Sequence, residues 1–211
     1  IGIALDGDAD RCVLCDEKGN FIHGDKIIGL IAKRYLDQGL LEGKSIVGTK
    51  MTNKGLENYL NNLNLNLIRA NVGDRYVVEK MRENGCNIGG EQSGHIILGE
   101  YGSTGDGLVA SLQIIASMVE NNIKISKLMD IFSLMPQTVE SISYDSSHFK
   151  YKNSDQFIKD TTKMHEKLLG KEGKIIIRAS GTESKIRIMG ECKNKILLNK
   201  TLKNLKTEIT N

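Results

Sequence analysis

The chain has 211 residues, of which 39% are hydrophobic and 26% charged, and its net charge is +3. This composition is that of an ordinary soluble protein with one large or two small domains. Basic residues are interspersed with acidic ones and form no aromatic-lined stripe, so nucleic acid is not expected as a partner. No apolar stretch reaches the ~18 residues of a membrane span, so no membrane partner is expected either.

The first motif is DGDADR at residues 6–11, three carboxylates at alternate positions followed by an arginine. Apolar segments at 1–5 and 12–15 read as strands, so the carboxylates lie on a tight turn. Three anions this close repel each other unless a cation lies among them. Oxygen ligands favour Mg²⁺ before Ca²⁺ or Mn²⁺. We therefore predict a metal site at Asp6, Asp8 and Asp10.

An EF-hand calcium loop is an alternative, because it would add Glu17 to the three aspartates at the matching positions. It is disfavoured because Arg11 replaces the glycine needed for the sharp turn, and because strands flank the motif. A solvated acidic turn without a bound metal is a further alternative.

Cys12 and Cys15 are three residues apart and point to opposite faces of a strand. Reduced, packed thiols in the cytoplasm are therefore favoured over a zinc or redox pair.

After this motif, helices and strands alternate. Helices are expected over about 25–36, 53–63, 74–81 and 108–119, the first three capped by Asp25, Asn53 and Asp74. Strands are expected over 45–48 and 66–69, at Ile88, and over 95–98. The last helix carries Leu108, Leu112, Ile115 and Val119 on one apolar face. This order predicts a mixed, parallel-rich α/β layer domain.

Pro136 is the only proline and suits a linker. Beyond it we expect a small α+β C-terminal domain, with strands at 139–144, 174–178 and 185–191 and helices at 154–169 and about 196–209. A hydrophobic strand needs neighbours, and residues 1–5 have none upstream. We therefore expect the chain to be a piece of a longer protein.

Two further loops carry polar groups suited to a sugar phosphate. In GGEQSGH (89–95), Glu91 can accept two hydroxyls at once, although a plain polar turn is equally open. In RASGTESKIR (178–187), backbone N–H groups at Ser180, Gly181 and Thr182 can form a nest for phosphate. Arg178 and Arg187 flank it as phosphate-gripping arginines, the alternative being a hairpin with surface arginines.

Together, the segments DGDADR (6–11), GEQSGH (90–95), TGDG (104–107) and RASGTES (178–184) resemble the α-D-phosphohexomutases. The resemblance implies a four-domain enzyme with one loop of each domain facing a central cleft. Residues 1–18 would end domain 2, 19–134 would form domain 3, and 138–211 would form domain 4.

The resemblance also implies the roles of individual residues. One Mg²⁺ per active site would be bound by Asp6, Asp8 and Asp10 together with a phosphoserine. A small phosphosugar would be bound by Glu91, Ser93, His95, Arg178, Ser180, Gly181, Thr182 and Arg187. Arg11, His95 and Lys50 are candidates for the general base. A hexosamine 1,6-bisphosphate would be the intermediate and activator, and a homodimer is allowed.

The implied reaction interconverts glucosamine 6-phosphate and glucosamine 1-phosphate, because Gln92 stands where phosphomannomutase-like relatives tend to carry methionine. A phosphomannomutase or phosphoglucomutase, and a non-catalytic sugar-phosphate-binding module, are the alternatives. A phosphatase is disfavoured because its aspartate nucleophile needs a different loop. Ala179 and Ser184 replace prolines usual in the family, which softens the loop. The phosphoserine motif T/S-A-S-H-N-P does not occur in these residues, so no mutase turnover is expected from them alone.

Overall fold

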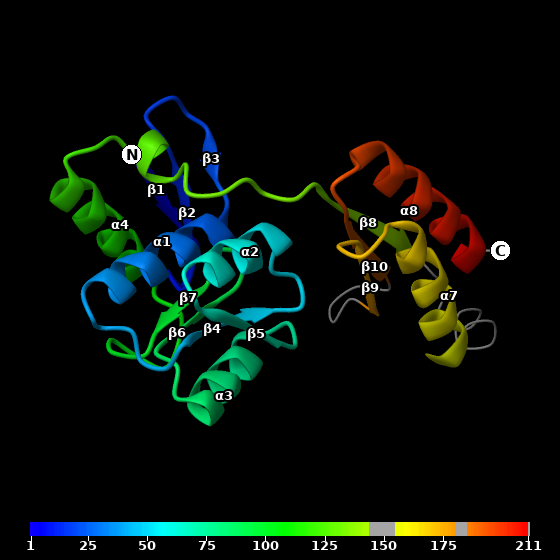
Figure 1. The fold of residues 1–211 in the computed structure, drawn as a ribbon, viewed down its shortest axis with the longest axis horizontal. Coiled ribbons are helices and arrows are strands. Elements are labelled where there is room, and N and C mark those ends of the chain that lie inside the picture. Colours follow the sequence, from blue (N-terminus) through cyan, green and yellow to red (C-terminus); the bar gives the residue numbers. More distant parts are fainter. Residues whose placement is uncertain (144–154, 180–184, 211) are drawn as a thin grey trace. The chain divides into compact units, whose positions relative to one another are not determined.

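A computed structural model of the chain describes residues 1–143, 155–179 and 185–210. The chain divides into two compact units, Ile1–Leu134 and Met135–Asn211, which are described separately below (Figure 1). No helix among the described residues is long and apolar enough to cross a membrane.

The first unit holds two sheets. One is an antiparallel sheet of β1 (Gly2–Leu5), β2 (Cys12–Cys15) and β3 (Phe21–Ile22). The other has the order β5-β4-β6-β7, with β4 (Ser45–Thr49), β5 (Asn66–Ala70), β6 (Ile88–Gly90) and β7 (Ile96–Leu98). Strands β5 and β6 pair parallel with β4, and β7 pairs antiparallel with β6. The turns after β4, β5 and β6 therefore meet at one edge of the sheet.

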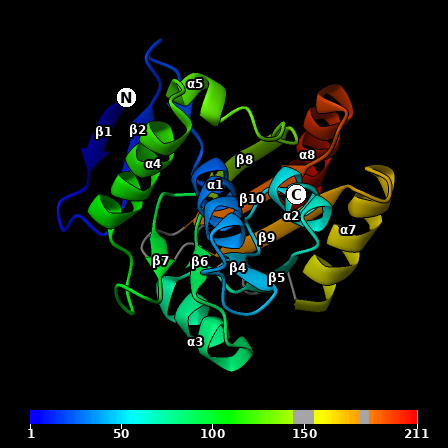
Figure 2. The same ribbon diagram turned by 60° about the vertical axis from the view of Figure 1, so that its left-hand side comes forward.

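Helices cover both faces of this four-stranded sheet (Figures 1 and 2). α1 (Gly24–Asp37) and α2 (Lys54–Asn62) lie on one face and α3 (Asp74–Asn84) on the other. α4 (Gly107–Asn121) packs against α1, β2 and β7, and the short α5 (Ile125–Leu128), which sequence patterns missed, follows it. The main core joins α1, the sheet and α4, with Leu14, Ile31, Ile46, Ile88 and Ile114 fully buried.

Of the three N-cap residues predicted for α1, α2 and α3, one is confirmed. Asn53 caps α2 as predicted, and its side chain accepts a hydrogen bond from Gly55 N. Asp25 does not cap α1: His23 does, through a 3.2 Å contact between Nδ1 and Asp25 N. Asp25 lies inside the first turn, where it is fully buried and its Oδ2 accepts a hydrogen bond from Asn53 N at 2.7 Å. Asp74 is likewise the first helical residue of α3, and Gly73 occupies the cap position.

The apolar face predicted for α4 is not the face that packs. Leu108, Leu112 and Val119 are exposed, whereas the buried side includes Ser111 and Ser117. The Ser111 hydroxyl donates to Gly107 O within the helix at 2.6 Å, which satisfies its donor. At the start of this helix the backbone approaches a neighbour closely, because a Cβ at Gly107 would lie 2.4 Å from Arg11 O.

The second unit is a three-stranded antiparallel sheet with the order β8-β10-β9 and two helices. Its elements are β8 (Gln137–Ser143), α7 (Asp155–Leu168), β9 (Lys174–Ala179), β10 (Lys185–Glu191) and α8 (Lys195–Thr210). Its core combines Ile175, Ile186 and Ile188 with Leu198 and Leu202. Pro136 belongs to this unit, because its carbonyl accepts a hydrogen bond from Cys192 N at 3.1 Å. The mixed, parallel-rich α/β layer followed by a small α+β unit confirms the predicted fold class.

Candidate metal and ligand loops

The three aspartates of the acidic turn lie together between β1 and β2. Each of Asp6, Asp8 and Asp10 offers a carboxylate oxygen, and these oxygens lie within 4.8 Å of one another. Ala9 adopts a left-handed φ of 59°, which closes the turn with a 3.2 Å bond from Ala9 N to Asp6 O. Asp6 Oδ1 also accepts from Arg11 N at 3.1 Å. These bonds within the turn bring the three carboxylates together, and Gly107 N supports the turn from a distant segment by donating to Ala9 O at 2.9 Å.

Only part of this negative charge is balanced within the turn. Arg11 Nε lies 3.8 Å from Asp6 Oδ2 and 3.6 Å from Asp10 Oδ1. Asp10 Oδ1 is nevertheless buried without a hydrogen-bond partner. A buried carboxylate oxygen that lacks a partner is costly, and a cation among the three carboxylates would satisfy it. The residues present therefore fit a hard, oxygen-ligated divalent cation.

The acidic turn contacts the loop at 90–95 directly. Arg11 and His95 form an antiparallel bridge, and Cys12 N donates to Gly94 O at 3.1 Å. Gly94 has a φ of +90°, and a Cβ at this position would overlap the Cys12 carbonyl oxygen. Only glycine therefore allows the two loops to approach this closely.

His95 joins the two loops through its side chain as well. Its ring is 2% exposed, and Nδ1 lies 3.1 Å from Asp10 Oδ2. Nε2 lies 3.1 Å from Gly105 N, in the TGDG segment that precedes α4. Asp106 of that segment caps α4 by accepting from Val109 N at 2.8 Å. Residues that are distant in sequence thus meet around one imidazole.

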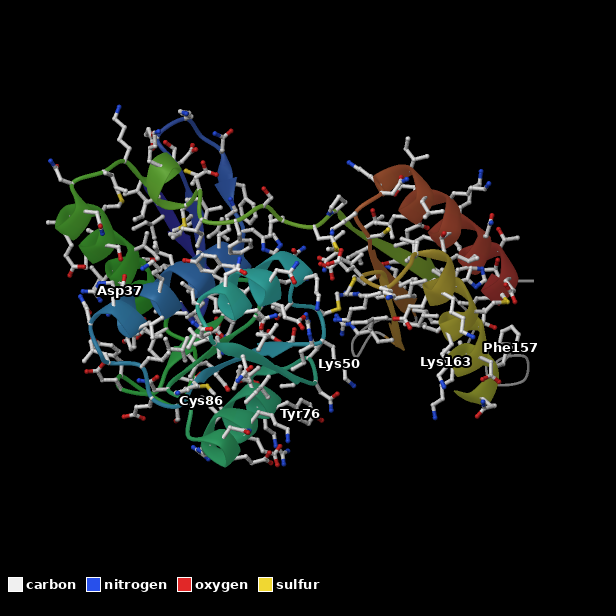
Figure 3. All side chains as sticks on the ribbon, in the orientation of Figure 1. Asp37, Lys50, Tyr76, Cys86, Phe157 and Lys163 are labelled. Atoms are coloured by element: carbon white, nitrogen blue, oxygen red, sulfur yellow. The ribbon has the colours of Figure 1, made fainter. Side chains whose placement is uncertain are left out.

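The loop at 90–95 follows β6 at the sheet edge where parallel strands end, the usual place for a ligand in such folds. Glu91 Oε1 accepts a hydrogen bond from Gly73 N at 2.9 Å, which ties the loop to the turn after β5. Ser93 is exposed, and Gln92 Oε1 is buried without a hydrogen-bond partner. Lys50 lies exposed on the turn after β4, where Figure 3 labels it. Sequence patterns did not indicate Gly73, and they indicated Gly105 only as part of the TGDG segment, because both residues act through backbone N–H groups.

In the second unit, Arg178 and Arg187 are cross-strand partners on β9 and β10. They lie in strands rather than in the connecting loop, and both are half-buried. Alternation along each strand places them on the face opposite Ile177 and Ile188, which pack in the core. Arg178 Nε is buried without a hydrogen-bond partner. Ser180, Gly181 and Thr182, predicted as the phosphate nest, lie outside the described residues.

Comparison with known proteins agrees with this arrangement. Residues 23–135 match the family model of phosphoglucomutase/phosphomannomutase alpha/beta/alpha domain III, and residues 117–207 match that of the C-terminal domain. The chain therefore belongs to the phosphoglucomutase/phosphomannomutase family of α-D-phosphohexomutases, as its motifs predict.

Among its relatives are phosphoglucosamine mutases. That of Parvibaculum lavamentivorans is 47% identical over 191 residues, which are 90% of this chain and 42% of the relative. That of Pelagibacter ubique is 49% identical over 203 residues, which are 96% of this chain and 45% of the relative. The chain thus spans less than half the length of these curated relatives.

Solved structures share the fold. An N-acetylglucosamine-phosphate mutase in its product complex matches with a TM-score of 0.77 and 18% identity, over 97% of this chain and 48% of that one. The Aspergillus fumigatus N-acetylphosphoglucosamine mutase in complex with GlcNAc-6P and magnesium matches with a TM-score of 0.71 and 19% identity, over 96% of this chain and 50% of that one.

Proposed function

We propose that this chain supplies the metal, sugar and phosphate loops of a Mg²⁺-dependent mutase that interconverts glucosamine 6-phosphate and glucosamine 1-phosphate. The observation that carries the proposal is the bridge between Arg11 and His95, which holds the acidic turn against the loop at 90–95. Moving a phosphoryl group between two hydroxyls of one sugar needs a cation and a hydroxyl-binding loop side by side. The 47% and 49% identity to phosphoglucosamine mutases supports a hexosamine over a hexose.

In this proposal Asp6, Asp8 and Asp10 hold Mg²⁺, and Asp10 offers Oδ1. When bound, Mg²⁺ offsets the negative charge of the phosphoryl oxygens. Arg11, beside the same turn, donates to those oxygens as well. Glu91 has one oxygen engaged by Gly73 N, so its other oxygen accepts from a sugar hydroxyl.

The remaining groups bind the rest of the ligand. The exposed Ser93 hydroxyl contacts the sugar beside Glu91. Arg178 and Arg187, with Ser180, Gly181 and Thr182, hold the phosphate that is not reacting. Two half-buried arginines at directly opposite positions of β9 and β10 support this role, since an anion bound by both would offset the repulsion between like charges.

The phosphoryl carrier is a separate matter. Family resemblance implies a phosphoserine and a bisphosphate intermediate, and the T/S-A-S-H-N-P motif is absent from these 211 residues. Without a nucleophile, positioning alone provides no route to transfer. We therefore expect the 211-residue polypeptide to bind the sugar phosphate without converting it, even with Mg²⁺ and a bisphosphate activator. Measurable conversion of glucosamine 6-phosphate by the pure polypeptide would overturn this expectation.

An NMR titration tests the proposal. Glucosamine 6-phosphate, added with Mg²⁺, is expected to shift the amides of residues 6–11, 90–95, 178 and 187. Mannose 6-phosphate, as a matched ligand, should shift residues 178 and 187 equally and residues 90–95 less. Glu91→Gln should weaken the response at 90–95 and leave that at Arg187 unchanged. Shifts confined to other surfaces, or equal responses to both sugars at 90–95, would contradict the assignment.

A further inference from the structure

The TGDG segment (104–107) has no ligand-binding role in the proposed function, although it is one of the four segments that resemble the family. Both of its glycines lie against the acidic turn. A Cβ at Gly105 would lie 2.6 Å from Asp10 O, and a Cβ at Gly107 would lie 2.4 Å from Arg11 O. Any larger residue would therefore have to push the segment and the acidic turn apart.

Ala9, inside the acidic turn, depends on contacts that hold its backbone. Its left-handed φ of 59° is unfavourable for a residue with a Cβ, and such a conformation persists where the surroundings hold it. Ala9 N donates to Asp6 O at 3.2 Å within the turn, and Ala9 O accepts from Gly107 N at 2.9 Å. These two bonds hold the peptide groups on either side of Ala9, which lead to Asp8 and to Asp10.

Gly107 is a donor that the rest of the first unit keeps in place. It is the first residue of α4, and its carbonyl accepts from the Ser111 hydroxyl at 2.6 Å. The preceding residue is tied to β7, because Asp106 N donates to Ile96 O at 3.2 Å. The first N–H groups of a helix have no partner within the helix. The Gly107 N–H is therefore available to Ala9 O and links the acidic turn to a helix that packs against α1, β2 and β7.

The carboxylates of Asp6, Asp8 and Asp10 repel one another when no cation lies among them. Asp6 and Asp8 are exposed, so little packing opposes their separation. We propose that Gly107 is a positioning residue whose N–H holds Ala9 in its left-handed conformation and so keeps the three carboxylates together for the cation. The inference rests on the metal site of the proposed function. Substitution of groups that hold metal ligands in place commonly weakens metal binding by about 10- to 100-fold.

Two glycine substitutions separate this role from stability. Gly107→Ala adds a Cβ that would overlap Arg11 O and so moves the start of α4 away from the acidic turn. Alanine forms helices better than glycine, so the substitution does not weaken α4 by itself. Gly55→Ala is the matched control, because Gly55 lies in the first turn of α2 and a Cβ there would lie 2.5 Å from Ser133 O. Both variants press a Cβ against a backbone carbonyl, and only Gly107→Ala does so at the acidic turn.

A Mg²⁺ titration of the 211-residue chain, followed by the amide shifts of residues 6–11, tests the proposal. We expect Gly107→Ala to weaken Mg²⁺ binding about 10-fold and Gly55→Ala to leave it unchanged, although both variants lower the urea midpoint of unfolding. Equal weakening in both variants would show that lost stability determines the affinity, and it would overturn the positioning role. Unchanged affinity in Gly107→Ala would overturn it as well.

Metal-free measurements test the inference separately from the metal site. The ¹³Cα and ¹³Cβ shifts of Ala9 report its backbone conformation. They should indicate a left-handed φ in the unsubstituted chain and in Gly55→Ala, and they should move toward ordinary values in Gly107→Ala. Ala9 shifts that are the same in all three chains would overturn the proposal.

Hydrogen exchange of the unsubstituted chain adds a test that needs no variant. The Gly107 amide should exchange slowly, because its bond to Ala9 O occupies an N–H group that is open at the start of an isolated helix. Rapid exchange of this amide would overturn the proposal. A chain that gave no Mg²⁺ response would contradict the proposed metal site, and the Ala9 shifts would still decide whether Gly107 holds the turn.

Discussion

Arg178 on β9 and Arg187 on β10 are direct cross-strand partners, so two positive side chains share one face of the second sheet. Like charges at directly opposite positions destabilise a sheet. The Nε atom of Arg178 is in addition buried without a hydrogen-bond partner. Both costs would fall if an anion were bound by the two guanidinium groups, which supports the phosphate-binding role proposed above.

Replacing Arg187 with alanine should therefore weaken anion binding. Two guanidinium groups should hold inorganic phosphate in the millimolar range, about 4 kcal/mol, and Arg187→Ala should weaken it several-fold. Phosphate titration followed by NMR measures this, and binding should weaken further as salt rises. Lys203→Ala, which removes an exposed charge on α8, is the control. An equal loss in both variants would mean that net charge, not this pair, binds the anion.

Gly94→Ala should destabilise the first unit. The residue has a φ of +90°, and its Cβ would overlap the carbonyl oxygen of Cys12. Strained backbone and steric overlap together should lower the free energy of unfolding by about 2 kcal/mol or more. Urea unfolding read from amides of residues 1–134 measures the effect. Gly102→Ala, where the added Cβ meets open space, should change stability by less than about 0.5 kcal/mol.

Asp25→Ala should loosen the turn after β4. The buried carboxylate accepts from Asn53 N at 2.7 Å, between the starts of α1 and α2, where helix dipoles favour negative charge. Removing it leaves a buried N–H without its acceptor, which costs about 1–3 kcal/mol. Asp25→Asn keeps an acceptor and should cost less. Exposed Asp37→Ala is the control, and hydrogen exchange of the Asn53 amide reports the loosening. An Asn53 amide that stays fully protected in Asp25→Ala would argue against the role.

The ionised Glu57 carboxylate should stabilise the fold at neutral pH, so the free energy of unfolding should fall as Glu57 is protonated in acid. Burial acts to raise the pKa of Glu57, but hydrogen bonds from Arg69 and Lys54 outweigh it and lower the pKa below its ordinary 4.5. A carboxyl whose pKa is lower in the folded state stabilises the fold above its unfolded pKa. That contribution is lost as pH falls below 4.5 through the folded value. Glu57→Gln should be less stable at pH 7 and show a flatter decline in this range. An unchanged pH profile of urea midpoints would contradict the assignment.

Features built from neighbouring residues could be predicted from the sequence. The acidic turn has hydrogen bonds of its own among Asp6, Ala9 and Arg11, and the Asn53 cap is satisfied two residues later by Gly55 N. Most strands followed for the same reason, because alternation and flanking turns are local signals.

Features that depend on distant partners could not be predicted. The residue type of Asp25 predicts a helix cap, yet its carboxylate accepts a hydrogen bond from Asn53 N, 28 residues away. Nothing in the sequence near His95 indicates that Gly105 N and Asp10 enclose its ring. Backbone donors such as Gly73 N cannot be predicted from residue type, because every residue except proline has the same N–H group. These groups meet only in the folded chain, so the residue types alone do not predict the contacts.

The inverted packing of α4 has a consequence for anyone redesigning this chain. A design procedure guided by hydropathy would keep Leu112 and treat Ser117 as a free surface position, although Leu112 is 51% exposed and Ser117 only 2%. We expect Leu112→Gln to be tolerated, because the Leu112 side chain is already half exposed to solvent. Ser117→Leu should be destabilising, because it forces extra volume into a buried contact. Along this helix, Leu108, Leu112 and Val119 are the variable positions, whereas Ser111 and Ser117 are as buried as the core residue Ile114.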